Sequence, residues 1–375
     1  DGELLFVANA NNNNVAVFDV EDRGRARSLG YIPVGWFPTS VRVSADGRTL
    51  LVANGKGAAS APNPRGPYPG SPAPRNLEEY IGGLFKGTLS VIDLPEEKRR
   101  ETQFGAWARA AKACSPLTAD GAPRGERPAG SPIPAKGGDP SPIRNVIYVV
   151  RENRTYDQVL GDLEKGKGEP RLCLFGEKVT PNAHALAREF VLLYNLYADG
   201  EVSADGHEWT MAAYATDFVE KSWPLSYGHN TARKYDYPSE GAYPIATPAG
   251  GYLWDRAAAA GVSYRSYGEF CFTPTKPGAV QSVASLPVLV GHIDEQYRAW
   301  DMDFPDVKRA ERFIAELRRF EREGGMPRLQ VLRLGNDHTQ GTRAGKPTPV
   351  AMVADNDLAL GMVIEALSRS KFWTD

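Results

Sequence analysis

Residues 145–157 read Asn-Val-Ile-Tyr-Val-Val-Arg-Glu-Asn-Arg-Thr-Tyr-Asp, and this stretch decides the fold of the second half of the chain. An apolar run from Asn145 to Val150 gives way at once to polar residues. Such a continuous apolar run is typical of a strand in a parallel sheet that is covered on both faces. Ligands of α/β proteins bind where these strands end. The sequence therefore predicts that Glu152 and Asn153 lie at a ligand-binding edge.

Two interpretations of this polar segment remain open from its sequence. A carboxylate beside a carboxamide at a strand end is well placed to bind a divalent metal through oxygen atoms. Alternatively, the segment starts a helix, with Asn153 or Thr155 as its N-cap and Glu152 in solvent. The residue types of this segment alone are compatible with both.

Strand-like and helix-like segments alternate after this stretch. Helical apolar spacing runs through residues 181–190, 251–260, 306–323 and 350–370, and strand-like runs at 262–267 and 328–334 fall between them. Strands that alternate with helices of this length indicate an α/β layered domain, which we place at residues 144–375.

The first 112 residues predict short strands between turns, at residues 4–9, 15–19, 40–44, 49–54 and 88–93. Phe6-Val7-Ala8-Asn9 recurs as Leu51-Val52-Ala53-Asn54 at an offset of 45 residues, close to the length of a propeller blade. Two blades cannot close a ring, so residues 1–112 predict the C-terminal blades of a β-propeller, with a small independent β-sandwich as the alternative. Residues 113–143 are rich in Pro and Gly and predict a linker.

Composition argues against several classes of protein. The chain has 44 Lys plus Arg and 46 Asp plus Glu, and the formal charge of -2 gives no electrostatic reason to expect a nucleic-acid partner. No apolar run approaches the roughly 20 residues of a transmembrane helix. Three scattered cysteines suit neither a disulfide scaffold nor a zinc site. The sequence starts at Asp1 and stops after a helix-like stretch, so we expect both ends to be cuts.

Residues 202–209, Val-Ser-Ala-Asp-Gly-His-Glu-Trp, form a second candidate site after an apolar run at 190–197. Ser203 stands just before a helix-like stretch, where backbone N–H groups and the helix dipole favour an anionic substrate. The alternative is that Ser203 caps the helix and His207 is an ordinary histidine.

A third candidate site follows the strand-like run that ends at Leu334. Asp337 and His338 stand in the loop Gly-Asn-Asp-His-Thr, which begins at residue 335. Imidazole and carboxylate groups suit Zn, Mn or Fe, and histidine titrates near neutral pH. The pair is therefore a candidate for metal binding or for acid–base chemistry.

Taken in order, the segments at 151–157, 203–209 and 336–339 resemble the phosphoesterase family of bacterial phospholipases C and acid phosphatases, a branch of the alkaline-phosphatase-like fold. The strands of the first half resemble the YncE-like, YVTN-type propeller. The resemblance covers about residues 145–375 for the enzyme and 1–112 for the propeller. It implies a multidomain protein, with a partial β-propeller of all-β blades followed by an α/β alkaline-phosphatase-like domain.

The resemblance also implies roles for individual residues. Ser203 would be the nucleophile and His338 the active-site histidine, while a divalent cation (Zn, Mn, Fe, Mg or Ca) would be bound by Glu152, Asn153, Ser203 and Asp337. The sequence departs from the family pattern at Gly206, where Asn is common, and at Thr339, where Pro is common. The family has a further acidic pair and a histidine after the last helix, so a chain that stops at Asp375 should bind metal weakly.

These implications predict a phosphatase or phospholipase C-like enzyme that hydrolyses the phosphoric ester of a small molecule or lipid and that is exported to the periplasm or the outside of a bacterium. The aromatic stretch from Trp223 to Tyr243 would line the substrate side or form a packed loop; its members include Tyr227, His229, Tyr235 and Tyr237. The alternative is a non-catalytic exported protein that binds ligands through its propeller and needs no stoichiometric cation.

Overall fold

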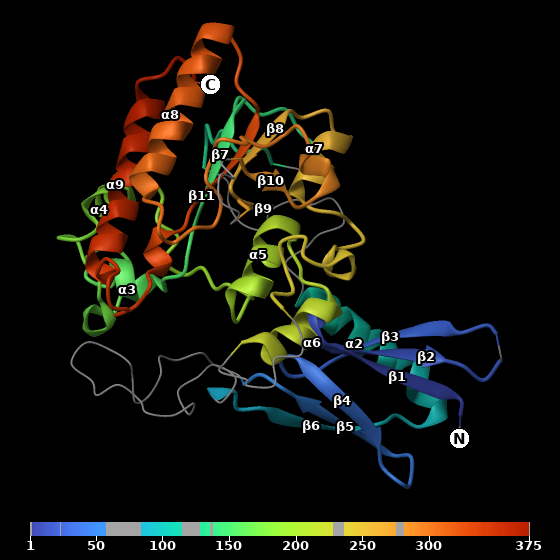
Figure 1. Ribbon diagram of the computed structural model, residues 1–375. Helices are drawn as coiled ribbons and strands as arrows, with labels where there is room; N and C mark the ends of the chain where they lie inside the picture. The colour runs from blue at the N-terminus through green and yellow to red at the C-terminus, as the bar shows by residue number, and fades with distance from the viewer. Residues whose placement is uncertain are drawn as a thin grey trace. The chain divides into compact units, whose positions relative to one another are not determined.

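The computed structural model describes residues 2–22, 24–57, 84–114, 128–135, 138–227, 236–274 and 281–374. The described residues up to Ser141 form one compact unit, here the N-terminal unit, and those from Pro142 onwards form the C-terminal unit. Their elements are drawn in Figure 1. Among the described residues, no helix combines the length and apolarity that crossing a membrane would require.

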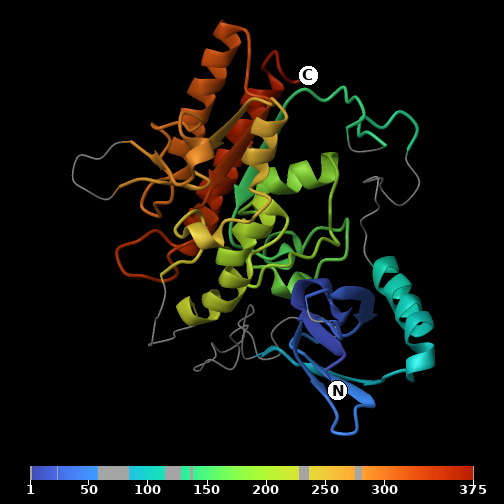
Figure 2. The ribbon, with the colours of Figure 1, turned by 90° about the vertical axis from the view of Figure 1, so that its right-hand side faces the viewer.

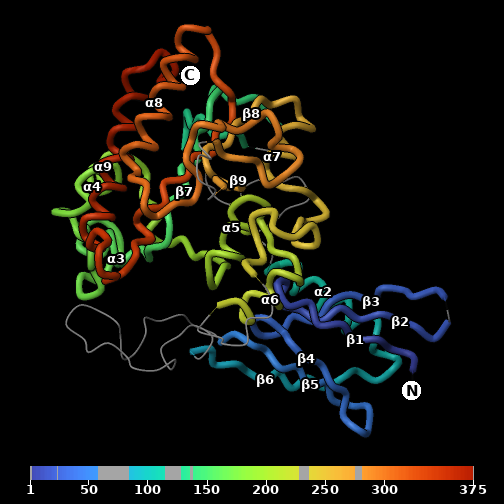
Figure 3. Tube along the Cα trace, in the orientation of Figure 1, coloured from blue at the N-terminus to red at the C-terminus, as the bar shows by residue number. Residues whose placement is uncertain are grey.

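The N-terminal unit contains two antiparallel sheets of three strands each, traced in Figure 3. One sheet has the order β1 (Leu4–Asn9), β2 (Asn14–Asp19), β3 (Arg27–Pro33), and the other β4 (Pro38–Val43), β5 (Thr49–Asn54), β6 (Thr88–Asp93). Helix α2 (Arg100–Ala113) packs against β3. Neither sheet closes into a barrel within the described residues, and the propeller stays a prediction.

The core of the N-terminal unit forms where the two sheets and α2 bury their apolar side chains. Val15 and Val17 of β2, Val52 of β5 and Phe104 of α2 belong to one buried cluster. Strands β1, β5 and β6 have the bounds that the sequence predicts, whereas β3 and α2 were not predicted. Only Phe104 is buried in α2, so this helix has almost no apolar periodicity to reveal it.

Gly30 allows α2 to lie close to β3. Its φ is +124°, and a Cβ built there would lie 2.9 Å from Ala108 Cβ and 3.3 Å from Phe104 O. We expect Gly30→Ala to lower the free energy of unfolding of the N-terminal unit by about 1–2 kcal/mol, measured by urea denaturation. Gly47→Ala is the control, because its φ is +71° and no described atom lies within 4 Å of the added Cβ. An equal loss in both variants would contradict the close packing at Gly30.

The C-terminal unit is built on a parallel sheet of three strands. The order is β7 (Val146–Arg151), β11 (Leu329–Leu334), β8 (Tyr264–Tyr267), with an antiparallel pair of β9 (Cys271–Phe272) and β10 (Val283–Ala284) beside it.

The described α-helices of the C-terminal unit are α3 (Tyr156–Leu160), α4 (Pro181–Glu189), α5 (Ser203–Ala212), α6 (Asp217–Ser226), α7 (Leu253–Ala259), α8 (Asp306–Glu323) and α9 (Pro349–Ser368). Short 3-10 helices are η1 (Ala10–Asn12) and η3 (Glu97–Arg99) in the N-terminal unit, and η4 (Pro170–Leu172), η5 (Pro244–Ala246), η6 (Pro287–Leu289) and η7 (Asn336–His338) here.

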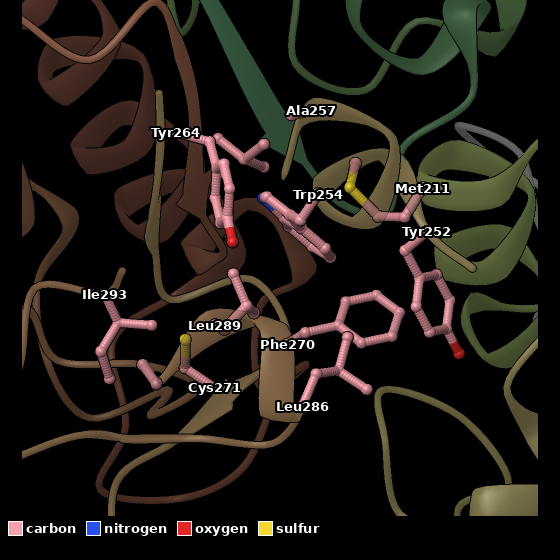
Figure 4. Packing of buried hydrophobic residues seen from close by; sticks show 12 residues of the cluster. Met211, Tyr252, Trp254, Ala257, Tyr264, Phe270, Cys271, Leu286, Leu289 and Ile293 are labelled. Carbon is pink, nitrogen blue, oxygen red and sulfur yellow. The ribbon is translucent and has the colours of Figure 1, made fainter. Parts of the chain in front are cut away.

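Helices cover both faces of the parallel sheet. Successive side chains of β11 therefore enter two different apolar cores. Leu332 and Leu334 pack with α8 and α9, whereas Val331 packs with Trp254 of α7 and with Phe270. Figures 1 and 2 show α8 and α9 side by side, and Figure 4 shows Trp254 and Phe270 in the other core. Alternation with period two places Arg333 on the same face as Val331.

The turn that follows β11 is fixed by a buried carboxylate at the start of α8. Asp306, which is 0% exposed, accepts the side chain of Arg309 at 2.8 Å. Its second oxygen accepts the N–H of Asn336 at 2.7 Å and Nδ2 of Asn356 in α9 at 2.9 Å. These hydrogen bonds join α8, α9 and η7, so they set the position of Asp337 and His338.

Candidate functional site

A cavity of about 700 Å³ lies at the carboxyl ends of β7 and β11. The described residues that line it include three of the predicted site residues, Glu152, Ser203 and His338. Open α/β sheets bind ligands at this edge, because the loops that follow neighbouring strands meet there. The cavity is therefore the candidate active site of the C-terminal unit.

Ser203 and Asn153 meet at the cavity although they lie 50 residues apart in the sequence. Asn153 Nδ2 lies 3.5 Å from Ser203 Oγ. Ser203 is the first residue of α5, so its hydroxyl stands at the N-terminus of that helix. The N-cap position belongs to Val202, and Asp205 accepts the N–H groups of Glu201 and Val202 at 2.9 Å each. Asp205, rather than Ser203, therefore serves the capping role.

Glu152 is buried at the end of β7, with 8% of its surface exposed. Its N–H donates to Asp337 Oδ1 at 3.0 Å, and the peptide bond between Glu152 and Asn153 is cis. Helix α3 begins only at Tyr156, with Thr155 as its N-cap. The segment thus holds both features considered from the sequence, a helix start at Thr155 and a strand-end carboxylate that is not in solvent.

Asp337 contacts the site through the backbone of Glu152, and it is not among the described residues that line the cavity. It is 4% exposed, and burial raises the pKa of its carboxyl to about 7. Arg154 donates to the carbonyl oxygens of Asp337 and His338, at 2.7 Å in each case. These contacts hold the end of β7 against η7.

His207 lies between two carboxylates inside the site. Its Nδ1 is 2.7 Å from Glu269 Oε1, and its Nε2 makes a short hydrogen bond with Glu152 Oε2. Arg333 donates to Glu152 Oε2 at 3.2 Å and to Glu240 Oε2 at 2.7 Å. The site thus contains a group of three glutamates, one histidine and one arginine, in which Glu240 is partly exposed and the others are buried.

The sequence predicted Glu152 as a metal ligand and placed His207 in the second candidate segment without a role of its own, but it did not single out Glu240, Glu269 or Arg333. One signal was present, because Arg333 is the one charged residue in the strand Leu-Gln-Val-Leu-Arg-Leu. Charged residues are rarely buried without a partner.

Electrostatic interactions keep Glu152 ionised. Burial opposes ionisation, but the hydrogen bond from His207 and the charge of Arg333 outweigh it and lower the pKa of Glu152 to about 2. Burial also disfavours a charged His207, yet the carboxylates of Glu269 and Glu240 raise its pKa well above the usual value. The site therefore presents an anionic oxygen ligand at neutral pH.

His338 lines the cavity beside an aromatic side chain. Its Nδ1 is 3.0 Å from Thr339 O, and its ring meets the ring of Trp300 edge to face, with centroids 5.1 Å apart. The guanidinium of Arg333 lies 4.8 Å from the centre of the Trp300 ring. Trp300 therefore packs against both His338 and Arg333 and limits how His338 can move.

Aromatic residues from the stretch around 223–243 form part of the cavity wall. Tyr227 and Tyr237 line it, with ring centroids 6.3 Å apart, and the hydroxyl of Tyr237 donates to Glu240 Oε1 at 3.1 Å. Burial raises the pKa of both phenols, so they remain protonated donors. His229 and Tyr235 lie outside the described residues.

The donors near Ser203 fit a divalent cation. Glu152 offers a carboxylate, Asn153 a carboxamide and Ser203 a hydroxyl, which are the oxygen ligands that hard and borderline cations prefer.

A separate acidic group, made of Glu201, Asp205 and Glu220, has ligand atoms within 4.8 Å of one another. Because Asp205 in that group already caps α5, we assign the group a structural role.

No family model, no curated protein and no solved structure matches this chain. The function is therefore inferred from the residues and geometry of the site.

Proposed function

We propose that this protein hydrolyses phosphoric esters, as a phosphatase or phospholipase C-like enzyme in which Ser203 is the nucleophile and His338 the acid. The observation that supports this most directly is the 3.5 Å approach of Asn153 to Ser203 beside a cavity that His338 also lines. The resemblance assigns these three residues to one phosphoryl-transfer site.

Ser203 is well placed to attack an anionic phosphoryl group. The N–H groups at the start of α5 and the helix dipole favour negative charge at its hydroxyl. In the proposed step the Oγ–P bond forms while the P–O bond of the ester breaks. The hydroxyl proton of Ser203 goes to solvent, and the departing oxygen takes a proton from His338. Water then attacks phosphorus and the Oγ–P bond breaks, so that Ser203 regains a proton from the water and His338 regains one from solvent. A monoester substrate thereby releases phosphate, and a diester substrate releases a phosphate monoester.

Glu152, Asn153 and Ser203 would hold the divalent cation. When bound, the cation would stabilise charge on the phosphoryl oxygens and lower the pKa of the Ser203 hydroxyl. Asp337, which the resemblance names as a further ligand, supports the site by accepting the N–H of Glu152. The buried network around Glu152 keeps that carboxylate charged and in place before substrate arrives.

The cavity leaves room for an organic leaving group. Its volume of about 700 Å³ exceeds what a phosphate alone would fill, and pockets of this size accommodate small organic ligands. Tyr227, Tyr237 and Trp300 supply an aromatic wall for that group.

The proposed function is tested with the full-length protein and two chromogenic substrates, p-nitrophenyl phosphate as monoester and bis-p-nitrophenyl phosphate as diester. We expect release of p-nitrophenol, its loss after chelation with EDTA, and its return when Mn²⁺ is added, because the reaction needs the bound cation. The preferred ester would distinguish a phosphatase from a phospholipase C-like enzyme. Silence of the folded, cation-loaded protein on both esters would instead favour a non-catalytic ligand-binding protein.

A further inference from the structure

We propose that His207 is a positioning residue, which holds the Glu152 carboxylate in the orientation that binds the cation and is itself anchored by Glu269. This inference rests on the proposed function, because it assigns a task within the same site. His207 is 4% exposed and Glu269 is fully buried. His207 lies in the second candidate segment, where it was assigned no role of its own from the sequence, and Glu269 was not singled out from the sequence.

The orientation of the His207 ring is fixed by hydrogen bonds at both nitrogens. Nδ1 meets Glu269 Oε1 at 2.7 Å, and Nε2 meets Glu152 Oε2. Each ring nitrogen therefore faces a side-chain oxygen of a different glutamate at hydrogen-bond distance. Rotation of the ring would break both contacts and leave buried carboxylate oxygens without their donors.

The contacts of Glu152 leave one oxygen for a ligand. His207 Nε2 and Arg333 donate to the same atom, Oε2. Neither of these two donors contacts the other carboxylate oxygen, Oε1. Two hydrogen bonds to Oε2 restrict rotation of the carboxylate, so they also fix the direction in which Oε1 can bind a cation. Hydrogen-bonded supports of this kind typically change metal affinity 10–100-fold when they are removed.

The test compares His207→Asn with His207→Gln in the full-length protein. The amide of Gln reaches about the position of histidine Nε2, so Gln keeps a donor toward Glu152. The amide of Asn reaches only about the position of Nδ1, so Asn keeps the contact toward Glu269 and loses the one to Glu152. Both changes remove the same ring and the same charge. The pair therefore separates the hydrogen bond to Glu152 from a general electrostatic or packing effect.

The readout is the Kd for Mn²⁺, followed by the electron paramagnetic resonance signal of free Mn²⁺. We expect His207→Asn to raise the Kd about 10–100-fold and His207→Gln to raise it by a clearly smaller factor. At saturating Mn²⁺ the kcat of the Asn variant on p-nitrophenyl phosphate should recover, because the defect lies in holding the cation. His292→Gln, at an exposed histidine stacked on Tyr264, is the matched control.

The positioning role would be overturned if the His207→Asn, His207→Gln and wild-type proteins had the same Kd for Mn²⁺. It would also be overturned if both variants raised that Kd by the same factor. The proposed function would stand in either case. Absence of Mn²⁺ binding by the wild-type protein would overturn the proposed function and the positioning role with it. If His207→Asn does not fold, Glu269→Gln replaces it, since it weakens the anchor at nearly constant shape. We then expect a raised Kd, and an unchanged Kd would refute the role of Glu269 as anchor.

Discussion

Ser203→Ala should lower kcat for phosphoric ester hydrolysis by at least about 10⁴-fold in the full-length protein, because loss of a serine nucleophile costs several orders of magnitude where covalent catalysis operates. Its hydroxyl stands at the start of α5, 3.5 Å from the Asn153 amide. The measurement is steady-state hydrolysis of p-nitrophenyl phosphate at saturating Mn²⁺. Saturation is needed because Ser203 is also a proposed ligand of the cation.

Two variants serve as controls for the nucleophile. Ser285→Ala removes another serine that lines the same cavity and should leave kcat nearly unchanged. Ser203→Thr keeps a hydroxyl at the helix start and should retain part of the activity. Hydrolysis by Ser203→Ala at the wild-type rate would show that a different group attacks phosphorus.

Glu208→Gln should stabilise the protein at alkaline pH by up to about 3 kcal/mol. The Glu208 side chain is fully buried in α5, and burial raises the pKa of its carboxyl to about 7. A 2.8 Å hydrogen bond from Ser239 lowers this pKa, but by less than burial raises it. In the unfolded chain the same carboxyl titrates near 4.5. Between these values the folded protein holds a proton that the unfolded chain releases, so stability falls by about 1.4 kcal/mol per pH unit as pH rises. Glutamine is neutral at every pH and still accepts the Ser239 hydrogen bond.

The sign of this effect gives a clear measurement. Urea denaturation of wild-type and Glu208→Gln proteins should give nearly equal free energies of unfolding at pH 4.5 and a growing advantage for the variant up to pH 7, with no further gain above it. Glu311→Gln, at an exposed glutamate of α8, accounts for the loss of one surface carboxylate. A difference between wild type and variant that stays constant from pH 4.5 to 8 would contradict a buried, protonated Glu208.

Local patterns predicted the elements whose signal lies within a short segment. Helix α8 has the predicted bounds, because a strong apolar periodicity ends at Gly324, whose φ of +87° terminates the helix. Helix α6 was missed, since Pro224 lies inside it and argues against a helix. Strand β3 was missed because the register of its pairing with β2 shifts near Gly30. Such a bulge interrupts the alternation of side chains by which a strand is recognised in the sequence.

The sequence predicted the site residues that lie in short local motifs. It did not predict the residues that hold them in place through tertiary contacts. Glu152, Asn153, Ser203 and His338 each follow a strand or start a helix, so short segments identify them. Glu152, Ser203 and His338 line one cavity, and Asn153 contacts Ser203. Glu240 and Glu269 join the site only through tertiary contacts with His207 and Arg333. Contacts across such sequence distances leave no local pattern. The propeller, the cation, the nucleophile and the exported location stay predictions.

The alternation along β11 constrains how this sequence can diverge. Odd-numbered residues such as Val331 and Arg333 face the site and the α7 core, while even-numbered Leu332 and Leu334 face α8 and α9. Inserting or deleting one residue within the strand would reverse this parity, turning Arg333 toward an apolar core and a leucine toward three glutamates. Descendants of this chain can therefore exchange side chains along β11, but length changes there must come in pairs or fall outside the strand.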